Sequence, residues 1–271
     1  MLAEHLNFFS KFIEKELGIV YSEKNYYQLE ARLEEIAKIF GLPDIAAVYN
    51  KAKEGITGSF KQLILDTATN NETSFFRDTR AFQAIEKIIL PEIISKVPPE
   101  EPLRVWSAAS SCGQEPYSIT MMFKELQQKS SFPKFKITAT DISERVLERA
   151  KKGCYSQLEI QRGLSAQYMI KYFQKDTQDQ WTINPEIRDL VEFKQKNLKE
   201  NFNFIYKFHL ILCRNVLLYQ SIESKIDIIN RISKCLTPNG YLILGAGESL
   251  VGLSNPFEQI LADGMVVYRL T

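Results

Sequence analysis

The residues best placed to do chemistry lie at the ends of two apolar segments near the middle of the chain. The segment Leu103–Ser118, LRVWSAASSCGQEPYS, is typical of a buried strand, a short loop with Gly113, and a helix that begins near Pro116. The segment KITATDI indicates a second strand with Asp141 just past its end. A strand, loop, helix and strand followed by an acidic residue form the skeleton of a nucleotide or nucleoside site in a doubly wound α/β sheet.

The loop between the first strand and the helix favours a cation over a phosphate. A pyrophosphate site needs closely spaced glycines at a helix N-terminus, whereas this loop has Gly113 alone and places Glu115 directly before the helix. A negative charge there repels phosphate. S-adenosylmethionine fits, because it contains adenosine without phosphate and carries an ammonium and a sulfonium. The alternative is an ordinary Rossmann-like unit in which Glu115 is only an acidic residue at a helix start.

The composition is that of a globular protein without a strong charge bias. The chain has 271 residues, of which 45% are hydrophobic and 25% charged, enough for one large α/β domain and a small one. The net charge of +1 indicates no nucleic-acid partner. Four separated cysteines and two histidines form no metal-ligand spacing, so we expect no metal. Since neither a signal peptide nor a membrane span is visible, we expect a cytoplasmic protein without direct membrane insertion.

Helical periodicity extends over roughly the first 70 residues. Apolar residues recur at helical spacing in residues 8–17 and 26–40, and further helices are expected near 45–53 and 60–68. We therefore predict an all-α N-terminal domain that, with its connecting segment, spans residues 1–80.

Strands and helices alternate in the rest of the chain. We expect helices at 82–94, 116–129, 143–152 and about 221–236, strands at 103–107, 135–140, 191–197, 209–215 and 241–247, a turn at 238–240, and a last, antiparallel strand at 264–270. This alternation predicts a Rossmann-like α/β domain over residues 81–271 with a mostly parallel sheet. The rhythm is interrupted at about 154–190, which we interpret as a small β insertion that overhangs the ligand-binding edge of the sheet.

Four short segments together resemble one protein family. They are NNETSFFR (70–77), SAASSCGQEPYS (107–118), ATDIS (139–143) and CRNVLLY (213–219). In this order they are similar to the CheR-type chemotaxis receptor methyltransferases, and the similarity covers essentially the whole chain. The resemblance implies a class I S-adenosylmethionine-dependent methyltransferase, a protein-glutamate O-methyltransferase. Its substrates would be glutamates on methyl-accepting chemoreceptors, and its products glutamyl methyl esters and S-adenosylhomocysteine.

The resemblance also implies roles for individual residues. Contacts to the cofactor are expected from Asn71, Thr73, Arg77, Glu115, Asp141, Asn197, Leu198, Arg214 and Asn215. Among these, Glu115 matches the acid near the methionine amine, and Asp141 matches the acid that holds the ribose hydroxyls. Asn197 and Leu198 match residues around the adenine. Arg77 and Tyr219 match the side chains nearest the methyl transfer and are the candidate catalytic residues.

These residue types suit methyl transfer to a carboxylate. A glutamate is already ionised at pH 7, because its reference pKa is about 4.3, so the reaction needs no general base. It needs alignment with the sulfonium methyl and shielding from water. An arginine can hold the carboxylate in a fixed fork, and a tyrosine hydroxyl can steer one of its oxygens. Each side chain also has a simpler alternative: a surface ion pair with Asp78 or Glu72 for Arg77, helix capping for Asp141, a turn for Asn197, and corner packing for Tyr219.

The sequence departs from the family pattern in three places. Gln114 stands where a second glutamate is common. Residues 23–40 hold three basic and four acidic side chains, so steering of an acidic receptor by that helix should be weak. The stretch 174–180, QKDTQDQ, lacks the glycine-rich loop with which some relatives capture a C-terminal receptor pentapeptide. We therefore expect this protein to act without that tether.

Two other functions are compatible with these residues. One is a methyltransferase for a small molecule or a nucleic acid, although a nucleic-acid enzyme would need a basic face with interleaved aromatic residues. The other is a non-catalytic module that binds S-adenosylmethionine and reports its level or scaffolds a signalling array.

Overall fold

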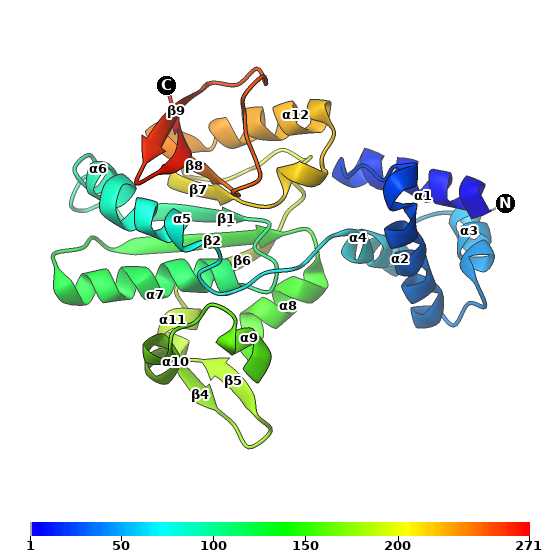
Figure 1. Ribbon diagram of the computed structural model, residues 1–271, viewed down its shortest axis with the longest axis horizontal. Coiled ribbons are helices and arrows are strands. Elements are labelled where there is room, and N and C mark those ends of the chain that lie inside the picture. The colour runs from blue at the N-terminus through cyan, green and yellow to red at the C-terminus, as the bar shows by residue number, and fades with distance from the viewer. Residues whose placement is uncertain (1) are drawn as a thin grey trace.

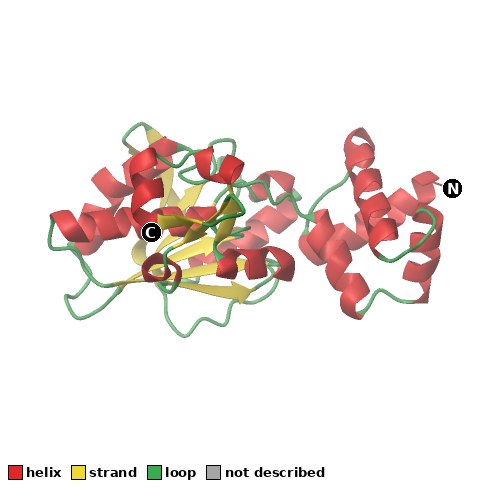
Figure 2. Ribbon diagram, turned by 90° about the horizontal axis from the view of Figure 1, so that it is seen from below, coloured by secondary structure: helices red, strands yellow, loops and turns green. Residues whose placement is uncertain are grey.

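The computed structural model describes residues 2–271 as a helical part and an α/β part (Figures 1 and 2). The two parts are joined by the connecting segment, residues 69–78, which lies between α4 and α5. The helices are α1 (Leu2–Leu17), α2 (Tyr26–Ile39), α3 (Ile45–Glu54), α4 (Gly58–Ala68), α5 (Thr79–Ala84), α6 (Leu90–Ile94), α7 (Gln114–Lys129), α8 (Glu144–Lys152), α9 (Gln157–Gln161), α10 (Ala166–Tyr172), α11 (Pro185–Arg188) and α12 (Ile222–Ser233). A π-helical turn (Ile85–Ile89) joins α5 to α6, and short 3-10 turns lie at Glu23–Asn25 and Leu217–Tyr219. The strands are β1 (Leu103–Ala108), β2 (Phe135–Asp141), β3 (Cys154–Ser156), β4 (Phe173–Lys175), β5 (Gln180–Ile183), β6 (Val191–Gln195), β7 (Phe208–Cys213), β8 (Leu236–Leu244), β9 (Phe257–Ala262) and β10 (Met265–Leu270).

Helices α1 to α4 form a bundle with its own hydrophobic core. Apolar residues at helical spacing, among them Phe9, Ile13, Leu29 and Leu33, are almost fully buried between the helices. Gly18 follows α1 with a left-handed φ of +74°, a conformation that ends helices and that glycine adopts without strain. The periodic apolar stripes of the N-terminal sequence are therefore core faces, as the sequence predicts.

The α/β part is built on a seven-stranded sheet in the order β6-β2-β1-β7-β8-β10-β9. Neighbouring strands are parallel from β6 to β8, and β10 pairs antiparallel with both β8 and β9. Residues of β7 are buried throughout, because one cluster with α5 to α7 covers one face and another with α12 covers the other. This confirms the predicted fold class, a mostly parallel Rossmann-like sheet with an antiparallel edge.

The strand order reverses beside β1, which lies between β2 and β7. In open α/β sheets, ligands bind outside the carboxyl ends of the strands at such a point. Three segments meet there: the loop 109–113 after β1, Asp141 at the end of β2, and the segment 214–219 after β7. The topology alone thus directs attention to the edge that carries most of the predicted site residues.

The predicted insertion is a small antiparallel sheet in the order β3-β5-β4, flanked by α9 to α11. It packs on the connecting segment through Phe75, whose ring lies edge-on to Tyr155 and Phe173 with centroid distances of 5.0 and 5.4 Å. Gly163 in this insertion approaches the Phe75 carbonyl so closely that a Cβ atom would lie 2.0 Å from its oxygen. The insertion therefore supports the segment that joins the two parts of the chain.

Several element boundaries differ by a few residues from the sequence expectation, and two of the differences bear on the argument. The turn expected at 238–240 lies inside β8, where Asn239 has a φ of +59° and the register with β7 shifts, so the turn is absorbed as a bulge. Helix α7 begins at Gln114, which places Glu115 in its first turn instead of before it. Within residues 2–271, no helix is both long and apolar enough to cross a membrane.

Candidate functional site

A pocket lies where the helical part meets the carboxyl edge of the sheet. Every site residue predicted from the sequence lines it: Asn71, Thr73, Arg77, Glu115, Asp141, Asn197, Leu198, Arg214, Asn215 and Tyr219. They come from the connecting segment, the first turn of α7, the end of β2 and the segments after β6 and β7. The pocket brings these residues together from sequence positions up to 148 apart, while their individual roles stay predictions.

Asp141 holds the loop after β1 in place. Its Oδ2 accepts a hydrogen bond from the backbone N–H of Ser111 at 2.8 Å, and its Oδ1 accepts one from the N–H of Ser143 at 3.0 Å. Burial raises the pKa of this carboxyl, and the backbone N–H groups of Ser143, Ser111 and Ile142 oppose that shift. Ser143 caps α8 with its own Oγ, bonded to Val146 N, so helix capping does not explain Asp141. Each carboxylate oxygen still has a lone pair free for a ligand hydroxyl.

Glu115 belongs to a part-buried charge cluster around the buried guanidinium of Arg214. Its Oε2 lies 3.0 Å from Nη1 of Arg214, and its Oε1 accepts a hydrogen bond from Ser107 Oγ at 2.8 Å. Nη2 of Arg214 lies 3.4 Å from Asp78 Oδ2 and donates to the carbonyl of Arg77 at 2.8 Å. The sequence did not reveal that Glu115 is paired with Arg214, which the β1–β7 pairing brings to it. Two carboxylates against one guanidinium still leave the cluster a net charge of −1.

The connecting segment forms one wall of the pocket. Arg77 Nη1 donates to the backbone carbonyl of Glu72 at 2.9 Å, and the Glu72 carboxylate pairs with Arg162 of the insertion. The hydrogen bond and charge of Arg162, with a smaller contribution from Arg77, lower the pKa of Glu72. Ser111 Oγ donates to the carbonyl of Asn71 at 2.8 Å, which ties this wall to the β1 loop. The two acidic residues suggested as surface partners of Arg77 pair with other arginines: Glu72 with Arg162, and Asp78 with Arg214.

Backbone strain concentrates around the pocket. Residues other than glycine with a left-handed φ include Ala109, Ser111 and Asn215 on its lining, and Phe76 and Asp78 beside Arg77, with φ between +47° and +62°. Such conformations each cost about 1–3 kcal/mol and persist only where neighbouring contacts enforce them. At this site, neighbouring contacts therefore override the local backbone preference of several residues.

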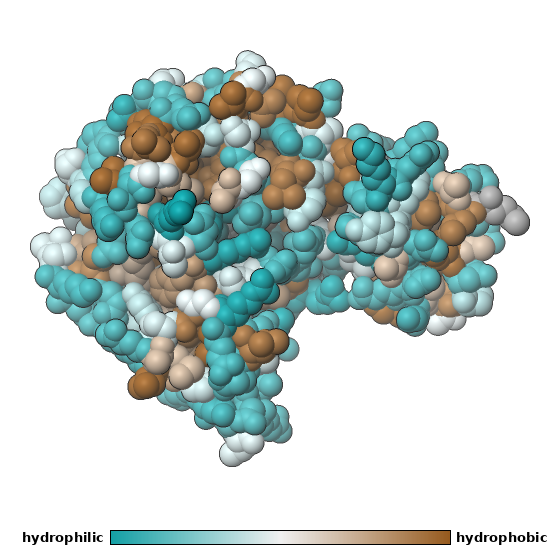
Figure 3. Space-filling model, viewed as in Figure 1, coloured by the Kyte–Doolittle hydropathy of each residue, from teal (hydrophilic) through white to brown (hydrophobic). Residues whose placement is uncertain are grey.

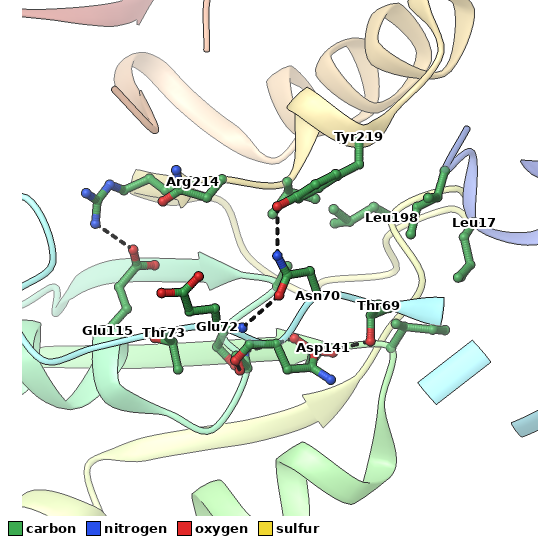
Figure 4. Close-up of a pocket in the computed structure, with 18 of the residues that line it drawn as sticks. Leu17, Thr69, Asn70, Glu72, Thr73, Glu115, Asp141, Leu198, Arg214 and Tyr219 are labelled. Carbon is green, nitrogen blue, oxygen red and sulfur yellow. Dashed lines mark hydrogen bonds and ion pairs between the residues drawn. The ribbon is translucent and has the colours of Figure 1, made fainter. Parts of the chain in front are cut away.

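Tyr219 stands at the pocket mouth with 37% of its surface exposed. Its hydroxyl oxygen accepts a hydrogen bond from Asn70 Nδ2 at 2.9 Å (Figure 4). The residues after α1 hold its backbone, because Val20 N donates to the Tyr219 carbonyl at 3.0 Å and Ser221 N donates to the Gly18 carbonyl at 3.1 Å. The N-terminal part of the chain therefore helps to position Tyr219.

Sequence reasoning predicted Leu198 at the apolar end of the pocket but missed the other apolar residues there. Leu17 at the end of α1 and Ile19 after it line the pocket with Ile142 and Leu198. Figure 4 shows Leu17 and Leu198 at one end and the Arg214–Glu115 pair at the other. An apolar residue on the stripe of an amphipathic helix gives no sequence signal that separates a ligand contact from core packing.

Asn197 has a structural part as well as its place on the lining. Its Nδ2 donates to the carbonyl of Glu16 at 2.8 Å, and its Oδ1 accepts from the N–H of Lys199 at 3.0 Å. The first bond joins α1 to the segment after β6, and the second is the turn contact that the sequence allowed.

The pocket as a whole suits an elongated ligand with a cation at one end and a flat apolar group at the other. The net negative cluster around Arg214 could face the cation, Asp141 could accept from hydroxyls, and Leu17, Ile142 and Leu198 could cover the apolar group. S-adenosylmethionine has these features in this order. In the described residues 2–271, no group of three or more His, Cys, Asp or Glu side chains is arranged to hold a metal ion.

The sheet order and the pocket at its carboxyl edge define a class of proteins, the Rossmann-like methyltransferases that use S-adenosylmethionine. Residues 71–266 match the family described as CheR methyltransferase, SAM binding domain. The chain is 37% identical to the chemotaxis protein methyltransferase of Vibrio parahaemolyticus, over 97% of this chain and 95% of that protein. It is also 37% identical to Cher2 of Pseudomonas putida and to chemotaxis protein methyltransferase 1 of Pseudomonas aeruginosa, in each case over 96% of both chains. The chain therefore belongs to the CheR methyltransferase family.

Proposed function

We propose that this protein methylates glutamate side chains on the cytoplasmic helices of methyl-accepting chemoreceptors, giving glutamyl methyl esters and S-adenosylhomocysteine. The observation that carries the proposal is the joint position of Arg77 and Tyr219 on a pocket whose two ends suit the two ends of S-adenosylmethionine. The names of the relatives, which are chemotaxis protein methyltransferases, support a role in chemotaxis adaptation. Such an enzyme acts in the cytoplasm, where these receptor helices lie.

In this proposal the cofactor lies along the pocket from the charge cluster to the apolar end. Glu115 and the net charge of its cluster attract the methionine ammonium, with Asn71, Thr73, Arg77, Arg214 and Asn215 around that half of the molecule. Asp141 accepts hydrogen bonds from the ribose hydroxyls, for which its oxygens have free lone pairs. Asn197 and Leu198 border the adenine, together with Leu17 and Ile142. When bound, the cofactor supplies an electrophilic methyl group on its sulfonium.

The catalytic contribution of the chain is then to hold the acceptor carboxylate in line with that methyl group. Because Asn70 donates to the Tyr219 oxygen, the phenolic hydrogen is free to bond one oxygen of an incoming carboxylate. One amino group of Arg77 is bonded to Glu72, and its remaining N–H groups can bind the same carboxylate. These contacts orient a nucleophile that is already ionised, so no proton has to be removed.

The test is transfer of labelled methyl from S-adenosylmethionine to purified cytoplasmic fragments of chemoreceptors. We expect label that mild alkali releases as methanol, because a carboxyl methyl ester hydrolyses in base. Tyr219→Phe and Arg77→Ala should each lower turnover by orders of magnitude, with a smaller loss of cofactor affinity for Tyr219→Phe. Tyr27→Phe, at an exposed tyrosine of α2, is the matched control and should be neutral.

Two results would argue against this function. Alkali-stable label would place the methyl group on nitrogen or carbon instead of a carboxylate. Binding of S-adenosylmethionine without transfer to any receptor fragment would favour the non-catalytic binding module.

We further propose that activity does not depend on a receptor pentapeptide tether. The turn between β4 and β5 has only four residues, 176–179, and is closed by Asp176 Oδ1, which accepts from the N–H groups of Gln178 at 2.8 Å and Gln180 at 2.9 Å. So short a turn offers little surface beside the strand edge for a bound peptide. Calorimetry with a receptor-tail pentapeptide should give no binding, and clear micromolar affinity would refute the proposal.

A further inference from the structure

One acidic side chain outside the pocket gathers four backbone donors. Glu248 lies in the loop after β8, and its Oε2 accepts from the N–H groups of Gly245 and Asn215, both at 2.7 Å. Its Oε1 accepts from the N–H groups of Val216 at 2.8 Å and Leu218 at 3.1 Å. Hydrogen bonds to an ionised acceptor are about twice as strong as bonds between neutral groups. A single carboxylate therefore fixes most of the segment 215–218.

That segment leads directly to the mouth of the pocket. Asn215, Val216 and Tyr219 line the pocket, whereas Glu248 does not. Asn215 is held at a left-handed φ of +60°. This conformation is costly for a residue with a side chain, and it persists where neighbouring contacts enforce it. The bond from Asn215 N to Glu248 supplies such a restraint.

The loop after β8 is fitted closely to the same segment. A Cβ atom at Gly245 would lie 2.7 Å from Asn215 Nδ2 and 2.8 Å from Asn215 N, so only glycine allows this approach. Figure 3 shows the surface of this face of the molecule, with apolar and polar groups interleaved around the junction of the two parts. Tyr219 is thus held from two sides, by the Glu248 loop through residues 215–218 and by Val20 through its own carbonyl.

We infer that Glu248 is a positioning residue for methyl transfer, which sets the place of Tyr219 through the backbone of residues 215–218. This inference rests on the proposed function, in which Tyr219 orients the acceptor carboxylate. Glu248 acts through the segment and touches neither the cofactor nor the acceptor.

Glu248→Gln tests the inference, because it keeps the shape of the side chain but turns one acceptor atom into a donor that faces two N–H groups. We expect kcat to fall by about tenfold or more, with KM for S-adenosylmethionine changed by only a few-fold. In a Tyr219→Phe background the same change should have little further effect, because its route of action is already lost. Asp176→Asn is the matched control, since Asp176 also accepts two backbone N–H bonds but lies at the tip of the β4–β5 hairpin, away from the pocket (Figure 1).

If Glu248→Gln lowered kcat by the same factor in the wild type and in Tyr219→Phe, the inference would be overturned. A general loss of stability would have this effect, because it acts regardless of Tyr219. Amide hydrogen exchange supplies a readout that needs no enzymatic activity. The amides of Asn215, Val216 and Leu218 should exchange faster in Glu248→Gln while those of β7 stay protected. Unchanged protection at these amides would refute the positioning role of Glu248, even if the wild type methylates receptors. Faster exchange in Glu248→Gln, combined with no methylation activity in the wild type, would count against the proposed function and leave the positioning role intact.

Discussion

Removing the guanidinium of Arg214 should destabilise the protein far more than removing that of Arg269. Both arginines bridge two carboxylates: Arg214 joins Glu115 and Asp78, and Arg269 joins Glu92 and Glu258. Their surroundings differ, because the Arg214 side chain is 2% exposed and that of Arg269 is 29% exposed. The perturbation is Arg214→Met, with Arg269→Met as the matched control.

The structure sets the size of the expected effect. Removing one partner of a buried pair leaves an uncompensated charge and costs about 3–5 kcal/mol. Glu115 is 14% exposed and keeps its bond from Ser107, so we expect the lower end, about 3 kcal/mol. Arg269 pairs with carboxylates that are 31% and 43% exposed, for which about 0–1 kcal/mol is expected. Adding Glu115→Gln to Arg214→Met removes the less exposed of the two stranded charges and should restore about 1–2 kcal/mol.

The assay is urea unfolding followed by tryptophan fluorescence. Both tryptophans, Trp106 in β1 and Trp181 in β5, lie in the α/β part, so the signal reports on the part that contains the cluster. Comparing midpoints at equal slopes gives the difference in the free energy of unfolding. A loss for Arg214→Met no larger than that for Arg269→Met, or no recovery in the double variant, would refute the reasoning that the buried Arg214 holds the two part-buried carboxylates together.

Two further predictions concern the junction and the far edge of the sheet. Gly18→Ala would place a methyl group 2.2 Å from Gln220 Oε1 and 2.9 Å from Ser224 Cβ, whereas Gly41→Ala, at a similar left-handed φ, meets nothing within 4 Å. Thermal melts should therefore show a larger loss for Gly18→Ala, by at least about 1 kcal/mol, together with weaker cofactor binding, and equal losses would contradict the close approach. Hydrogen bonds from Lys96 and Tyr241 lower the pKa of Glu92 to about 2, from a usual value of 4.5. The stability that this group contributes is present above pH 4.5 and is lost as the pH falls toward 2, so Glu92→Gln should flatten that part of the stability curve, and a curve with unchanged slope would contradict it.

Local patterns in the sequence were sufficient to predict the architecture. Apolar runs identify β1, β2 and β7, and helical periodicity identifies α1 and α2. The β1 loop with Gly113 and the acid after β2 could be recognised because the chemistry of that unit is contained in about 40 consecutive residues. The remaining site residues came from the family resemblance, and their roles, like the domain boundary at residue 80, stay predictions.

Features that depend on distant pairing could not be predicted. The Arg214–Glu115 pair joins residues 99 positions apart and exists because β1 and β7 are neighbours in the sheet. Leu17 lines the pocket only because α1 ends near the place where the strand order reverses beside β1. The apolar periodicity of α1 does not reveal this position. Glu248 has no local motif either, since its partners at 215–218 lie some 30 positions earlier in the chain.

The most direct test of the central claim, that this pocket holds S-adenosylmethionine with Asp141 at its ribose, is calorimetric titration. The wild type, Asp141→Ala and the control Asp176→Ala would each be titrated with S-adenosylmethionine and with S-adenosylhomocysteine, after circular dichroism has shown that all are folded. The account predicts micromolar binding of both ligands to the wild type and the control, and its loss in Asp141→Ala. No binding to the folded wild type, or equal binding to Asp141→Ala, would contradict it.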